Sequence, residues 1–279
     1  MDVEFFAERL ENLEKSIELV DIMEDSISND SVPHRELANK IGIRYGELRN
    51  IYKAQELKLL IDYYTFCEQL MKQFIYSVLD FHATDTNSHR KKYLNDNLNP
   101  RTFSPRVKYK EIEDNLNKYL DTSTRKIKLL SFCIESDIIH KHNELISARH
   151  TYAHKGEEPN FSILNYVKSN IVLLKLLLND FQNIEVHLST RLELQESVSQ
   201  LFKEQKKLQK LDVRSKNWKE RFGNLREIAS NAYRLFAQLE INSDGYLLLK
   251  SQLREFQEID LRCNLASNKR IIQRIVFEI

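Results

Sequence analysis

The 279-residue sequence is poor in the residues that shape tight turns, with only five glycines and four prolines. Antiparallel sheets need such residues at their hairpins, so their scarcity favours helices joined by short polar loops. Cysteine is scarce as well: Cys67, Cys133 and Cys263 lie far apart and form no CxxC pair. An odd, scattered set of cysteines predicts free thiols in a reducing compartment, without a disulfide framework or a zinc knuckle.

A long apolar segment is also missing. The longest apolar run, 171–178, is interrupted by Lys175 and is too short to cross a bilayer. The acidic start, Met1-Asp-Val-Glu, argues against a secretory signal. We therefore expect a cytoplasmic, soluble protein that has no membrane partner.

Common cofactor and metal motifs are absent. The sequence has no GxxxxGK[ST], GxGxxG or GxSxG, so P-loop, dinucleotide-binding and hydrolase-elbow sites have no support. His150 and His154 have the four-residue spacing of zinc ligands in HExxH, but Thr151 stands where a metalloprotease has its glutamate. With no cysteine nearby, we expect neither a metal nor another cofactor.

Charge is distributed unevenly although the net charge is only +1. Residues 1–30 hold ten acidic and two basic residues, whereas residues 203–226 hold nine basic and three acidic ones. The basic stretch has Trp218 and Phe222 as its aromatic residues for stacking on bases. Such asymmetry is typical of a nucleic-acid face, and equally of two solvated helix faces that touch each other.

Apolar periodicity predicts a succession of helices. Phe6, Leu10, Leu13, Ile17 and Val20 form the stripe of the first, over 3–23. The further helices that we expect span 33–40, a long segment after Gly42 up to 79, 111–119, 124–155, and a segment after 160 with heptad-like spacing. Residues 82–105 are predicted to be a loop, and Gly156 with Pro159 to end the 124–155 helix. Asn160 is placed to cap the following helix.

The fold class is therefore all-α, and two regions are expected. Residues 1–187 form an antiparallel helical bundle, and residues 188–279 add three or four helices with breaks near Asp212, 242–245 and 264–268. We assign the second region to oligomerisation, or to contact with a partner or RNA.

A carboxylate interrupts the apolar seam of the long helix. The seam runs through Leu57, Ile61 and Tyr64 and resumes at Met71, and Glu68 occupies the position between. A carboxylate facing a core requires a partner, which is either a structural neighbour or a group in a catalytic site. The sequence alone leaves both interpretations open.

A second polar concentration lies near the end of the 124–155 helix. The segment Arg149-His150-Thr-Tyr152-Ala-His154-Lys155 is followed by Gly156. An imidazole moves protons near neutral pH, and a guanidinium holds a phosphate, as cleavage of a phosphodiester requires. The alternative is a solvated basic helix end, which the helix dipole favours.

Arg149-x4-His154, followed by Lys-Gly, resembles the Arg-x(4–6)-His signature of the HEPN (higher eukaryotes and prokaryotes nucleotide-binding) superfamily. The segment from Tyr63 to Phe74, with Glu68 among aromatic residues, resembles the superfamily's early helix. The resemblance covers about residues 1–187, and the Arg/His motif is its specific part. His150 is a departure, because many members have asparagine directly after the arginine.

The resemblance implies a helical bundle that dimerises around the motif and cleaves RNA without metal. His154 would act as general base or acid for attack by the ribose 2′-hydroxyl, and Arg149 would stabilise the charge that develops on phosphorus. Glu68 would orient either of them, and the RNA-binding set would be His150, Tyr152 and Lys155. The product would carry a 2′,3′-cyclic phosphate. A toxin or antiviral-defence role, with a neutralising or regulatory protein partner, follows from the same resemblance.

The spacing of the two motif residues favours a homodimer. Five residues correspond to about 140° of helical rotation, so Arg149 and His154 do not share a helix face. A cleft composed of two chains tolerates this separation better than one isolated helix does. The site and the dimer are therefore linked expectations.

Two other functions remain open. A non-catalytic HEPN-like scaffold would bind a protein or a nucleotide through the same bundle. Residues 35–51 also resemble a helix-turn-helix, whose second helix would present a possible DNA-reading set of Arg44, Tyr45, Glu47, Arg49 and Asn50. Acidic surroundings and Gly46 within that helix count against DNA binding.

Overall fold

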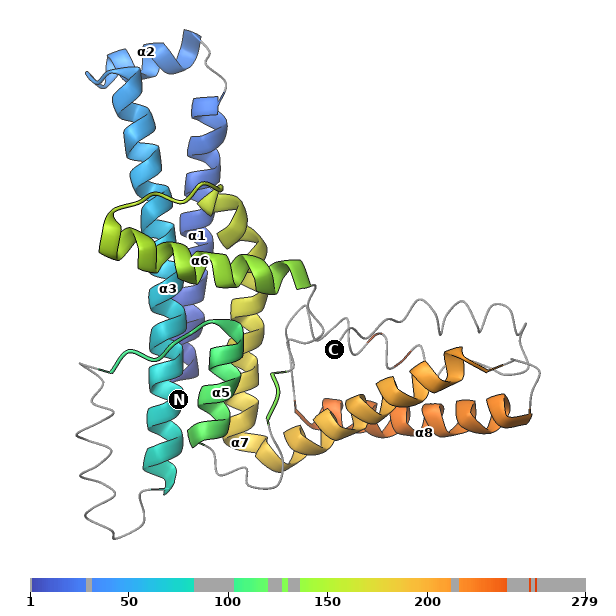
Figure 1. Ribbon diagram of the computed structural model, residues 1–279. Coiled ribbons are helices and arrows are strands. Elements are labelled where there is room, and N and C mark those ends of the chain that lie inside the picture. Colours follow the sequence, from blue (N-terminus) through green and yellow to red (C-terminus); the bar gives the residue numbers. More distant parts are fainter. Residues whose placement is uncertain are drawn as a thin grey trace. The chain divides into compact units, whose positions relative to one another are not determined.

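The computed structural model describes residues 2–28, 32–82, 103–119, 127–129, 136–211 and 216–239, with residues 251 and 254. All regular secondary structure in these residues is helical, which confirms the predicted all-α class (Figure 1). None of the described helices is long and apolar enough to cross a membrane. The chain divides into two compact units, 1–120 with 136–175 and 121–135 with 176–279. The region boundary at 188 stays a prediction.

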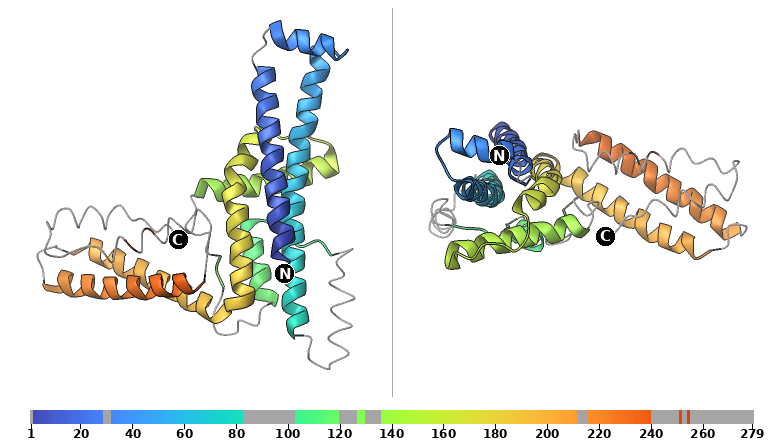
Figure 2. Two further views of the ribbon diagram at one scale, coloured as in Figure 1. Left: turned by 180° about the vertical axis from the view of Figure 1, so that it is seen from behind. Right: turned by 90° about the horizontal axis from the view of Figure 1, so that it is seen from above.

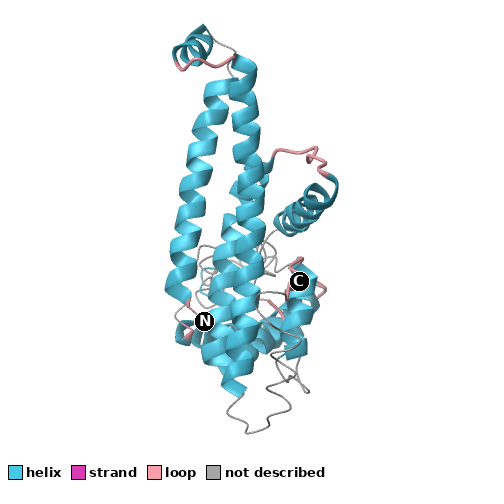
Figure 3. Ribbon diagram, turned by 90° about the vertical axis from the view of Figure 1, so that its left-hand side faces the viewer, coloured by secondary structure: helices cyan, strands magenta, loops and turns pink. Residues whose placement is uncertain are grey.

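Unit 1 is built on two long antiparallel helices. Helix α1 (Val3–Ser28) packs along α3 (Tyr45–His82), and the short α2 (Val32–Lys40) connects them (Figure 3). The predicted stripe of α1, from Phe6 to Val20, is buried. Asp2 starts α1 as its cap, because its carboxylate accepts a hydrogen bond from the Phe5 N–H at 3.1 Å. The helix continues to Ser28, five residues beyond the predicted end.

The acidic charge of α1 is partly compensated within unit 1. Lys168 and Lys175 belong to the first part of α7 (Ile163–Gln209), and they pair with Asp21 at 2.7 Å and with Glu14 at 2.6 Å. Figure 2 shows α1 beside α3 and beside this part of α7. The two ion pairs are partly exposed, so each contributes about 1 kcal/mol or less.

Two shorter helices complete unit 1, namely α5 (Tyr109–Tyr119) and α6 (Ser136–Lys155), and α6 crosses α3 (Figure 1). The predicted helix over 124–155 is therefore too long at its start. Residues 127–129 are not helical, and the Lys128 backbone binds side chains of α7 instead of helical partners. Residues 124–126 and 130–135 lie outside the described residues.

The turn between α6 and α7 corrects one predicted cap. Gly156 ends α6 as predicted, with φ +69° and its N–H bonded to the Tyr152 carbonyl at 2.9 Å. The cap of α7 is Ser162, whose hydroxyl accepts from the Asn165 N–H at 3.2 Å. Asn160 lies two residues too early to reach the N–H groups of the first helical turn.

A buried histidine joins α6 to α3 and to the segment before α5. The Nε2–H of His142 donates to the Val107 carbonyl at 2.8 Å, so Nδ1 accepts from the Tyr63 hydroxyl at 2.7 Å. His142 is fully buried, and burial lowers its pKa to about 4. The imidazole therefore stays neutral at physiological pH and serves the structure of the bundle.

Unit 2 contains the second part of α7, from Leu176 on, and α8 (Lys216–Gln238). Helix α7 ends at Gln209 and α8 begins at Lys216, so the predicted break near Asp212 falls between them. Trp218 and Phe222 stack on each other with ring centroids 5.2 Å apart and are buried, so they are not available to stack on bases. The predicted breaks at 242–245 and 264–268 lie outside the described residues.

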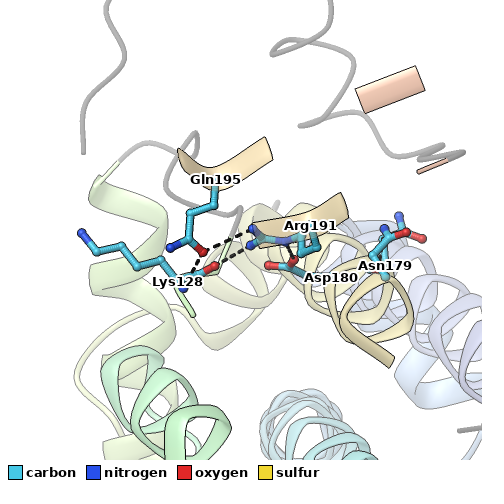
Figure 4. Close-up of polar contacts among 6 residues, drawn as sticks. Lys128, Asn179, Asp180, Arg191 and Gln195 are labelled. Atoms are coloured by element: carbon cyan, nitrogen blue, oxygen red, sulfur yellow. Dashed lines mark hydrogen bonds and ion pairs between the residues drawn. The ribbon is translucent and has the colours of Figure 1, made fainter. Parts of the chain in front are cut away.

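A buried ion pair forms within unit 2 where α7 bends. The bend is at His187, whose φ of −129° and ψ of 40° are not helical. Arg191 Nε donates to Asp180 Oδ1 at 2.8 Å, and the two side chains are 0% and 1% exposed (Figure 4). Eleven residues of straight helix span about 16 Å, more than these two side chains can reach, so the bend is required for the contact.

The rest of the Arg191 guanidinium is also bonded. It donates to the Lys128 carbonyl and, at 3.4 Å, to Gln195 Oε1, which also accepts from the Lys128 N–H at 2.9 Å. Buried charges of this kind are tolerated only when paired and hydrogen-bonded. The network therefore fixes the 127–129 segment and both arms of α7 together.

Replacing Arg191 by leucine should destabilise unit 2 by about 3–5 kcal/mol, because the buried Asp180 carboxylate would lose the cation paired with it. Trp218 is the only tryptophan and lies in α8, so its fluorescence during urea unfolding reports on unit 2. Arg221→Leu is the matched control: it breaks the partly exposed Arg221–Glu204 pair and should lose about 1 kcal/mol or less. Equal losses in the two variants would contradict the role assigned to the buried pair.

The pKa of His142 predicts a pH dependence of stability. The unfolded chain, with a histidine pKa near 6.5, binds the proton before the folded chain does as the pH falls. The free energy of unfolding is therefore fully retained above pH 6.5 and should fall by about 3 kcal/mol toward pH 4. His142→Asn should remove this slope in urea titrations followed by circular dichroism, and exposed His140→Asn should keep it. Parallel pH profiles for the wild type and His142→Asn would refute the assignment.

Candidate active site

Arg149 lies on the face of α6 that packs against α3. That face carries His142, Leu145 and Ile146, all buried, and Arg149 is the next residue at helical spacing. Its Cζ lies 4.1 Å from the ring centroid of Tyr64, which is only 2% exposed. The guanidinium is thus held over an aromatic face as a half-buried cation–π pair.

His150 contacts the same tyrosine. Its ring centroid lies 5.3 Å from that of Tyr64, with the ring planes at 80°, so the two rings meet edge to face. Tyr64 therefore contacts two neighbouring residues of α6 at once. The structure brings Arg149 and His150 together on one aromatic platform.

The surroundings of His150 favour its neutral form. Partial burial lowers its pKa, and the positive charges of Arg149, His154 and Lys108 lower it further. Glu111, in the first turn of α5, acts in the opposite direction. The imidazole is therefore mostly unprotonated at neutral pH and available to accept a proton.

The remaining motif residues occupy the last turn of α6. His154 and Lys155 are exposed, and Tyr152 is half-buried. His154 thus lies on the solvent side while Arg149 faces α3, as the predicted rotation of about 140° requires. Within the described parts of the chain, no carboxylate pairs with Arg149 and no group bonds to His154.

Glu68 meets other partners than those predicted for it. Its Oε1 accepts from the Ser104 hydroxyl at 2.6 Å and lies 3.2 Å from Lys72 Nζ, and the carboxylate side chain is 16% exposed. These contacts satisfy the carboxylate in the seam of α3, one turn after Tyr64. An orienting role toward Arg149 or His154 stays a prediction.

The sequence does not predict Lys108 as part of the candidate site, but in the fold its charge acts on His150. Val107 is anchored to His142, and the Tyr109 N–H donates to Asn143 Oδ1 at 3.0 Å, so Lys108 is fixed between two points of α6. Glu111 accepts from the Lys108 N–H at 3.2 Å and so caps α5. Tyr64 was assigned to the core because it lies in the apolar seam, and no local signal marks its second role.

The pocket on another face of α6 has the wrong charge for RNA. It holds about 420 Å³ between α6 and residues 157–161 and is lined by Glu144, Glu157 and Glu158. An acidic lining repels phosphate, so this pocket is not suited to bind a phosphate group.

In unit 2, a groove of about 690 Å³ between α7 and α8 is lined by both signs of charge. Glu204 in this groove binds Lys207 at 2.6 Å and Arg221 at 3.0 Å. The basic stretch 203–226 is therefore partly neutralised by its own acids.

The helix-turn-helix residues form the entry to a longer helix. Gly42 adopts φ +75° between α2 and α3, and Glu47 accepts from the Arg44 N–H at 2.8 Å to cap α3. From Tyr45 on, the candidate recognition helix continues without interruption into the core as α3. DNA binding by this segment stays a prediction.

Among the described residues, no group of three or more His, Cys, Asp or Glu side chains comes together as metal ligands would. The chain matches no protein family, no curated protein and no solved structure with which it was compared. Its resemblance to the HEPN superfamily therefore still depends on the motif residues themselves.

Tyr64→Leu should remove the ring contacts of both Arg149 and His150. The pKa of His150 should then rise, because the imidazole loses part of its burial. Tyr64→Phe keeps the ring and should leave the pKa of His150 close to that of the wild type. The measurement is an NMR titration of the histidine ring signals, with circular dichroism to verify the helical fold. Unchanged His150 titration in a folded Tyr64→Leu variant would contradict the platform.

Proposed function

We propose that this chain is a metal-independent endoribonuclease of toxin or antiviral-defence type, with its active site at the C-terminal end of α6. One observation carries the proposal. Arg149 is held half-buried over Tyr64, without a carboxylate partner among the described residues and with two histidines within five positions.

An unpaired arginine at such a position is suited to a phosphate. A fully buried structural arginine is neutralised by a carboxylate, as Arg191 is by Asp180 in unit 2, whereas half-buried Arg149 has no carboxylate partner among the described residues. The planar guanidinium donates parallel hydrogen bonds to phosphate oxygens, and these bonds strengthen as negative charge develops on them. Lys108 adds a second cation, close enough to His150 to lower the pKa of that imidazole.

Histidines complete the requirements of RNA cleavage. One imidazole removes the proton of the ribose 2′-hydroxyl, the 2′-oxygen bonds to phosphorus, and the bond to the 5′-oxygen breaks as that oxygen gains a proton. The products are a 2′,3′-cyclic phosphate and a free 5′-hydroxyl. The resemblance to the HEPN superfamily assigns the proton transfer to His154.

The proposal includes a homodimer. Arg149 faces α3 while His154 is exposed, so a second copy placed against the end of α6 would bring its own His154 toward the phosphate held by Arg149. RNA is the substrate, Tyr152 and Lys155 contact its backbone, and a protein partner that covers this end of α6 would neutralise the enzyme.

The test incubates purified protein with mixed tRNA and mRNA in EDTA. Wild-type protein should cleave and leave 2′,3′-cyclic phosphate ends, because no step uses a metal. Arg149→Ala should reduce the rate by about 100- to 1,000-fold, as loss of a donor to a developing oxyanion does. Product ends are identified by their resistance to polyadenylation until the cyclic phosphate is removed.

Arg49→Ala, at an exposed site near the start of α3, is the control for loss of one positive charge and should cleave normally. Circular dichroism verifies that each variant keeps its helices. Absence of cleavage by the wild type, or equal cleavage by all three proteins, would favour a non-catalytic scaffold that binds its partner through the same bundle.

A further inference from the structure

The histidine that shares a contact with Arg149 is not the one that the motif names. Arg149 and His150 both contact Tyr64, at 4.1 Å and 5.3 Å from its ring centroid, so they lie at one place on α3. His154 is exposed on the last turn of α6 and has no described partner. Within one chain, the geometry pairs the guanidinium with His150.

We propose that His150 is the general base of the site and acts beside Arg149 of the same chain, with Tyr64 as the positioning residue for both. The inference rests on the proposed ribonuclease function and assigns the proton-accepting step within it. His154 then has the other role, as the acid that protonates the leaving oxygen.

The contacts of His150 suit a base. The edge-to-face contact with Tyr64 fixes the orientation of the imidazole, and a fixed base reacts without first having to be ordered. No described group forms a hydrogen bond with either ring nitrogen of His150, so a nitrogen is free to meet a hydroxyl. His142 contrasts with it, because both of its nitrogens are bonded within the core.

The charges around His150 keep it in the basic form. Arg149 and His154 act from α6 and Lys108 from the start of α5, while Glu111 on α5 opposes them and Tyr64 of α3 contributes burial. Burial and the three cations prevail, so the pKa of His150 lies below its ordinary value. His150 and His154 are both exposed, but the Tyr64 contact belongs to His150, so His154 is assigned the other proton transfer, to the leaving oxygen.

The step conserves atoms and charge. His150 accepts the proton of the 2′-hydroxyl, and the 2′-oxygen forms its bond to phosphorus while Arg149 binds the two non-bridging oxygens. The bond from phosphorus to the 5′-oxygen breaks, and that oxygen takes a proton from protonated His154 of the second copy. Exchange with water then returns each histidine to its starting form.

The deciding experiment compares His150→Asn, His154→Asn and His140→Asn in the EDTA cleavage assay. His140 is an exposed histidine on the same helix, and its replacement should leave the rate unchanged. Loss of the base in His150→Asn should lower kcat by about 100- to 10,000-fold at neutral pH. If the His150→Asn variant cleaves RNA at the wild-type rate, this inference is wrong and the proposed function still stands. If the wild-type protein does not cleave RNA, both the proposed function and the inference are wrong.

The pH profile separates a base from a structural residue. The acid limb of kcat/KM should follow the pKa of His150 that NMR measures in the free protein. Lys108→Gln removes one of the cations and should move both the acid limb and the pKa of His150 to higher pH. Lys110→Gln, in the first turn of α5, should move neither. If Lys108→Gln shifts the pKa of His150 measured by NMR but leaves the acid limb of kcat/KM unchanged, His150 is not the base.

Mixed dimers test which residues act in the same chain. Arg149→Ala and His150→Asn subunits, produced together, should stay inactive, because every site then lacks one member of the same-chain pair. Arg149→Ala with His154→Asn should regain about a quarter of the wild-type rate, since half of the dimers are mixed and each has one complete site. Recovery in the first mixture would place His150 and Arg149 on opposite chains and overturn the proposal.

Discussion

The position of α6 on α3 depends on polar residues that both helices bury at their crossing. Tyr63 and Tyr64 are consecutive on α3, and they meet His142 and Arg149, which lie seven residues apart on one face of α6. A polar group on a buried helix face is costly unless it meets its partner, so these pairs admit essentially one register of α6. The candidate site is a consequence of that register, because it sets which face of the last turn is exposed.

The two ends of this crossing use burial in opposite ways. His142 is fully buried and neutral, and its two ring nitrogens are hydrogen-bonded to the Tyr63 hydroxyl and the Val107 carbonyl. Its role is therefore to stabilise the bundle. Arg149 remains charged and only half-buried, and its counter-charge is not supplied by the described residues. The asymmetry leaves Arg149, and not His142, with a charged group that can meet the phosphate of the proposed reaction.

Local patterns could predict the elements whose signals are local. The stripe of α1 and the end of α6 at Gly156 follow from helical spacing and from one glycine. The seam predicted for α3 is wrong at Ile61, which is 43% exposed, although Glu68 further along it is largely enclosed. The start of α6 was placed too early, because the chain near Lys128 gives its hydrogen bonds to Arg191 and Gln195, more than sixty residues away. The bend at His187 is set in the same way by the Asp180–Arg191 contact. Periodicity contains no information about such partners.

The candidate site shows the same limit in its chemistry. The residue types at 149–155 are the basis of the proposed phosphodiester cleavage, and the predicted separation of Arg149 from His154 agrees with their placement on α6. The sequence gives no reason to rank His150 above His154, since that ranking comes from Tyr64 on one helix and Lys108 beside another. The proposed division of labour depends on these unequal neighbours: His150 shares Tyr64 with Arg149, and partial burial and three cations lower its pKa. A base beside the phosphate-binding arginine and a separate acid give each proton transfer its own group, whereas a single histidine would have to perform both in sequence.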